Sequence, residues 1–187
     1  MSSSVKSDDI YASDKTTSGI SQIARLLSDP TNTVNVGKAH LLLGLEAEER
    51  QDWDDAAKNY LRIVELAPAD DMVRYFGYNN RAYSLLQLKR FEEAETHCVA
   101  AIEVDDARHN AHKNLGLACE ALGRPVEAAV CFMYAGYRNA ADKRAWLHLQ
   151  QLLLKNPDLL AQVPDLAERM ADLCEFYEAH GGVPALN

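Results

Sequence analysis

Small and larger apolar residues recur along this chain at fixed spacings. Three pairs of positions lie 34 residues apart: Ala82 and Gly116, Ala94 and Ala128, Cys98 and Phe132. A further copy lies 38 residues upstream of the first member of each pair: Gly44, Ala56 and Tyr60. In each copy a small residue is followed after twelve positions by a second small one, and after four more by a larger one. This pattern predicts pairs of antiparallel helices, in which small side chains allow close approach and the larger one fills the gap.

The spacing divides the chain into three units, which we place at residues 37–70, 75–108 and 109–142. Asp52 is the expected N-cap of one second helix, and Pro125 suits the first position of another, where its missing N–H is not needed. Residues 71–74 amount to about one helical turn, so they can lengthen the first helix of the second unit without rotating its apolar face.

The segments that flank these units have weaker patterns. Residues 1–17 are polar and predict a flexible tail, whereas residues 18–29 predict a short amphipathic helix that Asp29 and Pro30 end. Its apolar side chains are Ile20, Ile23, Leu26 and Leu27, and we expect them to cap the first unit. Residues 143–155 continue the first-helix pattern as a degenerate fourth unit, and residues 165–180 predict a C-terminal capping helix.

The 34-residue period and its small and large positions resemble the tetratricopeptide repeat over residues 37–155. The resemblance implies an all-α fold, a right-handed solenoid of antiparallel helix pairs with helical caps at both ends. It also implies a concave groove lined by the first helices, at positions 2, 5, 6, 9 and 12 of each repeat. In this chain the main candidates are Lys38, Leu41, Leu42, Leu45, Phe76, Asn79, Asn80, Tyr83, Asn110, Lys113, Asn114, Leu117, Arg144 and His148.

These positions predict a groove with an apolar end, formed by three leucines of the first unit, and an amide-rich middle. A row of asparagines can pair with the backbone of an extended peptide, because each amide offers a donor and an acceptor. The alternative is that the asparagines are only solvated polar positions. Co-chaperones of this family grip acidic chaperone tails, and Asn80 matches their groove asparagine. Their other clamp positions are occupied here by Leu41, Leu45, Asn110 and Asn114, which argues against the same clamp.

The resemblance favours a non-enzymatic protein-interaction module, an adaptor or chaperone that holds a peptide segment of a partner protein. Two alternatives stay open. One is a structural assembly module that acts by self-association, and the other is a relative of type III secretion chaperones, which are also acidic proteins with three such repeats. Repeats and caps use nearly the whole chain, and no nucleophile and base pair or phosphate loop is visible.

The net charge, the hydropathy and the cysteines limit the classes of partner, location and cofactor that we expect. The chain has 187 residues and a formal net charge of −9, with no basic run to neutralise phosphates, so we expect neither nucleic acid nor an anionic membrane as partner. No apolar run is long enough to span a membrane, and we expect a cytoplasmic protein. The four cysteines and the histidines lack metal-ligand spacing, so we expect packing roles, no metal and no cofactor.

Overall fold

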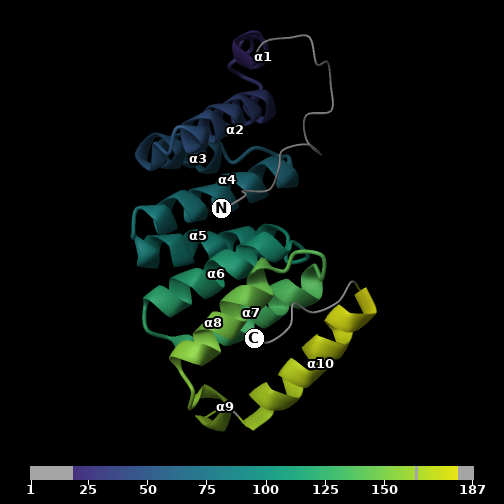
Figure 1. Cartoon of the computed structure of the whole chain (residues 1–187). Coiled ribbons are helices and arrows are strands. Elements are labelled where there is room, and N and C mark those ends of the chain that lie inside the picture. The colour runs from purple at the N-terminus through teal and green to yellow at the C-terminus, as the bar shows by residue number, and fades with distance from the viewer. Residues whose placement is uncertain (1–18, 163, 181–187) are drawn as a thin grey trace.

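A computed structural model of the chain describes residues 19–162 and 164–180, and in this part it contains helices but no strands. The expected tail, residues 1–17, lies outside the described residues. The helices are α1 (Gly19–Leu26), α2 (Thr33–Glu49), α3 (Trp53–Leu66), α4 (Asp71–Gln87), α5 (Phe91–Val104), α6 (His109–Ala121), α7 (Pro125–Arg138), α8 (Arg144–Lys155), α9 (Leu159–Gln162) and α10 (Pro164–His180). Figure 1 shows them stacked in chain order, from α1 at the top to α9 and α10 at the bottom.

Three helix pairs form the solenoid: α2 with α3, α4 with α5, and α6 with α7. As predicted, residues 71–74 lengthen the first helix of the second unit, because α4 begins at Asp71 and has 17 residues. The predicted start of the first unit at residue 37 is too late. Helix α2 begins at Thr33, behind an Asn32 side chain that caps it, and it also has 17 residues, against 13 for α6. The first two units therefore each contain one more helical turn than the third.

The turns between helices use the residues that the sequence indicated. The Asp52 carboxylate accepts a hydrogen bond from the backbone N–H of Asp55 and caps α3, as predicted. Pro125 opens α7 as expected. Gly123, in the turn before it, has a φ of +74°, a conformation that favours glycine.

Glycine in a first helix faces an aromatic ring in the second helix of the same unit. A Cβ at Gly44 would lie 2.4 Å from the Tyr60 ring, and one at Gly116 would lie 2.5 Å from the Phe132 ring. In the second unit the equivalent positions are Ala82 and Cys98, which are both fully buried. The space between the two helices of a unit is thus filled in two ways. The first and third units combine a glycine with an aromatic ring, and the second combines an alanine with the small thiol of a cysteine.

The N-terminal helix covers the first unit less than we expected. Helix α1 contacts α2 and ends at Leu26, three residues before the predicted end at residue 29. The Ser28 hydroxyl, just beyond the helix, donates a hydrogen bond to the Arg25 carbonyl at 2.8 Å. Ile20 is 79% exposed and Leu27 41% exposed. We expected all four apolar side chains to pack on the solenoid, and this is wrong for Ile20 and Leu27. Helix α1 has only eight residues, and its contact with α2 is too small to bury all four side chains.

The C-terminal end closes around Trp146, which is fully buried on α8. Helix α10 contributes Leu166, Leu173 and Tyr177 to the same cluster, and the Tyr177 ring lies 5.6 Å from the Trp146 ring. Helix α10 also contacts α7. Through this cluster α10 gives the degenerate fourth unit an apolar partner.

Candidate interaction face

The first helices α2, α4, α6 and α8 lie side by side and form what we call the first-helix face. The predicted site residues belong to these four helices. The structure brings some of them together in a polar centre and buries others in the core.

The four predicted asparagines are buried and are not an exposed row. Their exposed fractions are 2–6%. Asn114 Nδ2 donates to Asn79 Oδ1 at 3.1 Å, and Asn79 Nδ2 donates to Asn80 Oδ1 at 3.0 Å. Asn110 Oδ1 accepts a hydrogen bond from Arg144 at 3.3 Å. These amides tie α4 to α6 and α6 to α8, so the alternative that they are merely solvated positions is wrong.

Asn79 is at the centre of this network, and its loss should destabilise the fold. We expect Asn79→Ala to lower the free energy of unfolding by about 1–3 kcal/mol, because it leaves polar atoms of Asn80 and Asn114 buried without their partner. Thr96→Ala is the control, since that hydroxyl is exposed and bonds only within α5; it should change stability by less than about 0.5 kcal/mol. Urea denaturation of both variants tests this, and equal stability would show that the amides are not coupled.

Two apolar site residues lie in the core. Leu41 is 1% exposed and Phe76 is 4% exposed, and both belong to the cluster around Tyr60 and Ile63. The Phe76 ring also lies under the Arg108 guanidinium, 5.3 Å from the ring centroid. The expectation of a free surface on these two side chains is wrong, because the neighbouring helices cover their positions.

Other predicted residues keep part of their surface. Half-buried side chains on the face are Lys38, Leu42, Leu45, Tyr83, Leu117, Arg144 and His148. The Tyr83 ring meets the Trp53 ring edge-on at 5.7 Å, and His148 stacks on Phe132 at 5.4 Å. Leu147, the next residue to His148 in α8, is 44% exposed.

Charged residues gather where α6 meets α8. Arg144 Nε donates to Asp142 Oδ1 at 2.7 Å, and His109 Nε2 lies 2.9 Å from Asp142 Oδ2. Burial alone would raise the pKa of Asp142, but the hydrogen bonds from His109 and Arg144 hold it well below its usual range. Asp142 is therefore a carboxylate whose two oxygens already have partners.

Lys113 is the one buried lysine in the described part of the chain, with 7% of its surface exposed. Burial first, and then the positive charge of Arg144, lower its pKa to about 8. Within residues 19–162 and 164–180, no carboxylate lies at ion-pair distance from its ammonium group. Burial and the nearby Lys113 also lower the pKa of His148, which favours its neutral form. The centre of the face can thus accept an additional negative charge.

Sequence reasoning missed Asp142 and His109 as parts of this centre. Both lie at helix starts, 33 residues apart, which is close to one repeat length. An acidic residue two positions before Arg144 was the available signal, because such a pair can form an ion pair across a helix start.

The described residues contain no group of three or more histidine, cysteine, aspartate or glutamate side chains arranged to hold a metal ion. All four cysteines are free thiols, with Cys98 and Cys119 buried. None of the described helices is long and apolar enough to cross a membrane.

Comparisons with known proteins agree with this architecture. Residues 79–143 match the tetratricopeptide repeat family model. The Arabidopsis OM64 TPR domain is 28% identical, with 64% of this chain and 96% of that one covered and a TM-score of 0.59. The TPR2B domain of yeast Sti1, in complex with pHsp70, is 29% identical, with 64% and 94% covered and a TM-score of 0.55. MamA from Desulfovibrio magneticus shares the fold at 16% identity, with 88% and 89% covered and a TM-score of 0.62. No curated protein sequence matches the chain significantly.

Residues 79–143 thus carry tetratricopeptide repeats, and the fold of the chain is an all-α solenoid of helix pairs. This places it among the protein-interaction modules that are built from helical repeats.

Proposed function

We propose that the first-helix face binds an extended segment of a partner protein and that a carboxylate of this segment pairs with Lys113. The observation that carries the proposal is the buried ammonium group, which has no carboxylate partner in the described residues. Burying an unpaired charge costs stability. A protein retains such a group most readily where a ligand supplies the missing charge.

The similarity to the yeast Sti1 domain supports a peptide as the ligand, since that domain is described in complex with pHsp70. The proposed carboxylate-binding position differs from that of the co-chaperone clamp. At the clamp positions this chain has Leu41 and Leu45 in the first unit, and Asn110 and Asn114 in the third. Lys113 precedes Asn114 by one residue, and it is close enough to Arg144 of α8 for that charge to lower its pKa. The positive charge therefore lies nearer to α8 than it does in the co-chaperone clamp.

Neighbouring groups suit the rest of a peptide. Asn114 Oδ1 accepts no hydrogen bond from the described residues and can take one from a backbone N–H after a small rearrangement. Leu147 and Leu154, which share one side of α8, are 44% and 78% exposed and offer apolar contacts. The peptide would thus present an acidic residue flanked by apolar ones.

This binding mode fits an adaptor or chaperone. Self-association is the alternative, and the analogy to type III secretion chaperones adds no partner chemistry of its own. Sedimentation of the full chain separates the first two, because an adaptor with an available face is a monomer at the concentrations used for peptide binding.

The test uses the peptide SGPTIEEVD, which the second TPR domain of human RPAP3 binds. Its neutral counterpart, SGPTIQQVN with an amidated C-terminus, is the control ligand. We expect the acidic peptide to bind the full chain and the neutral one to bind at least roughly tenfold more weakly, since a hydrogen bond to a charged group contributes about 1.5–3 kcal/mol.

Lys113→Met should weaken binding of the acidic peptide by a similar factor. Lys58→Met, the same change at an exposed position of α3 outside this face, is the matched control and should leave the affinity within about twofold. Isothermal titration gives both values. Equal affinities for the two peptides, or for the two variants, would exclude Lys113 as the carboxylate seat.

A further inference from the structure

The outward side of α7 is apolar, whereas the equivalent sides of α3 and α5 are polar at seven of eight positions. Repeat spacings of 34 and 38 residues define the equivalent positions. In α3 they hold Asp54, Lys58, Arg62 and Glu65, and in α5 they hold Glu92, Thr96, Ala100 and Glu103. In α7 they hold Val126, Val130, Tyr134 and Tyr137. Tyr137 packs on Phe176 of α10, but Val126 is 38% exposed and Tyr134 is 49% exposed, so packing within the chain does not account for the apolar residues at these two positions.

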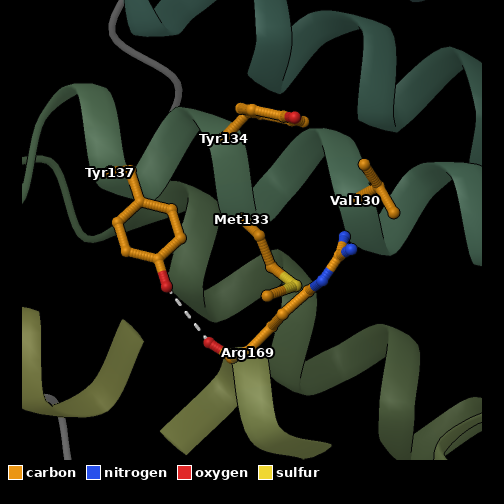
Figure 2. A pocket seen from close by; sticks show the side chains of 5 residues that line it. All are labelled: Val130, Met133, Tyr134, Tyr137 and Arg169. Carbon is orange, nitrogen blue, oxygen red and sulfur yellow. Dashed lines mark hydrogen bonds between the residues drawn. The ribbon is translucent and has the colours of Figure 1, made fainter. Parts of the chain in front are cut away.

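A pocket lies on this apolar side, between α7 and α10. Val130, Met133, Tyr134 and Tyr137 line it from α7, and Arg169 lines it from α10 (Figure 2). The Tyr137 hydroxyl donates to the backbone carbonyl of Arg169 at 3.2 Å and fixes one wall. The cavity volume is about 240 Å³. This is less than the roughly 300–1,000 Å³ of sites that enclose a whole small ligand, so the pocket fits one large side chain.

The lining selects the chemistry of that side chain. Two tyrosine rings and the thioether of Met133 favour an aromatic or large aliphatic group. The guanidinium of Arg169 extends across the pocket toward Val130 in Figure 2. In the part of the chain that the structure describes, no carboxylate forms an ion pair with Arg169. A cation without an ion-pair partner, in a protein of net charge −9, favours a carboxylate next to the apolar group.

We propose that this pocket, which we call the α7–α10 pocket, is a second docking site. Its occupant is a segment of a partner protein that inserts one aromatic or large aliphatic side chain and pairs an adjacent carboxylate with Arg169. The pocket is formed by a second helix and the C-terminal helix, and so it is separate from the first-helix face. One chain can thus hold two partner segments at the same time.

The test uses a minimal probe, the peptide Ac-Gly-Trp-Glu-Gly-NH2, and its matched neutral form with Gln in place of Glu. Methyl NMR of the full chain, labelled at methionine, follows the Met133 signal during titration. We expect the acidic probe to shift this signal and to bind roughly twofold to fivefold more tightly than the neutral one, as measured ion pairs of exposed groups suggest.

Variants of the pocket copy the residues of α5. Val130→Thr with Tyr134→Ala installs the side chains of Thr96 and Ala100, and it should abolish the Met133 shift with the helical signal unchanged. Arg169→Gln should remove the preference for the acidic probe but retain weak binding of both. Val99→Thr, on the exposed side of α5, is the matched control and should behave as the wild type.

Three outcomes would overturn the proposal. The first is equal affinity for the two probes in the wild type. The second is binding that occurs only after residues 181–187 are removed, which would make the chain's own segment the occupant. The third is a dimer that the Val130→Thr and Tyr134→Ala variant dissociates in sedimentation, which would make a second copy the occupant.

Discussion

Gly116→Ala should lower the free energy of unfolding by about 2 kcal/mol or more. The added Cβ would lie 2.5 Å from the ring of Phe132, which is fully buried and cannot move aside. Overpacking of this kind costs about 1–3 kcal/mol and occasionally more, and the short distance places this site at the upper end. The better helix propensity of alanine offsets only about 1 kcal/mol. Urea denaturation followed by circular dichroism measures the change.

The second unit supplies the control for this prediction, because it already combines alanine with cysteine at the equivalent positions, Ala82 and Cys98. Phe132→Cys alone should destabilise the chain by a few kcal/mol, as other large-to-small core changes do. In that background Gly116→Ala should be neutral or stabilising, which gives a coupling energy of at least about 2 kcal/mol. An equal loss from Gly116→Ala in both backgrounds would show that the ring does not set the requirement for glycine.

The helix pairs were predictable from the sequence because their packing depends on side-chain size. Gly44 and Gly116 recur where a ring must fit, and such a constraint is visible as spacing without any structure. The helix starts at Asp52 and Pro125 were predictable for a similar reason, since N-cap and N1 positions select few residue types. The earlier start of α2 was missed because the repeat match begins only at Gly37.

Burial on the first-helix face was not predictable from position in the repeat. The position of Asn114 or Leu41 within its unit indicates the side of the helix from which it projects. It does not indicate how closely a neighbouring first helix approaches, and here residues of α4 pack against Leu41 and bond to Asn114. Asparagines remain there because they satisfy one another across α4 and α6, a pairing between residues 35 positions apart. Polar composition alone does not distinguish such a network from a solvated surface.

The positive centre depends on a still more distant arrangement. Arg144 was a predicted site residue, but Asp142 engages both Arg144 and His109 at the start of α8, and Lys113 is left as the cation of this centre that forms no ion pair with a described residue. The distribution of charge among these groups follows from their distances, and these become known only with the fold. The proposed function of this site therefore rests on Lys113, and its buried charge leads to a second prediction with a large effect.

Lys113→Met should raise the free energy of unfolding at pH 7, although it removes the proposed ligand contact. Burial lowers the pKa of Lys113 from 10.5 to about 8, so below pH 8 the folded chain holds a charge that the unfolded chain solvates better. The shift corresponds to about 3 kcal/mol, and methionine has a similar shape without the charge. A stabilisation of about 1–3 kcal/mol is expected, since some of the lost contacts reduce the gain.

The pH dependence identifies the cause. Between pH 8 and pH 10.5 the unfolded chain keeps the Lys113 proton while the folded chain has lost it, so the stability of the wild type rises with pH over this range relative to the variant. The advantage of Lys113→Met should therefore be full below pH 8 and should shrink steadily above it. Lys38→Met shows the general effect of replacing a lysine by methionine. Tyrosines and cysteines that titrate in the same range are present in all three proteins, so their contributions cancel when the stabilities are compared. Urea denaturation at intervals between pH 6.5 and pH 9.5 measures all three proteins. A gain in stability that stays constant over this pH range would mean that packing, and not the charge, causes it. A loss of stability at pH 7 would show that Lys113 already has a partner within the chain. That result would remove the basis for a carboxylate ligand at this site.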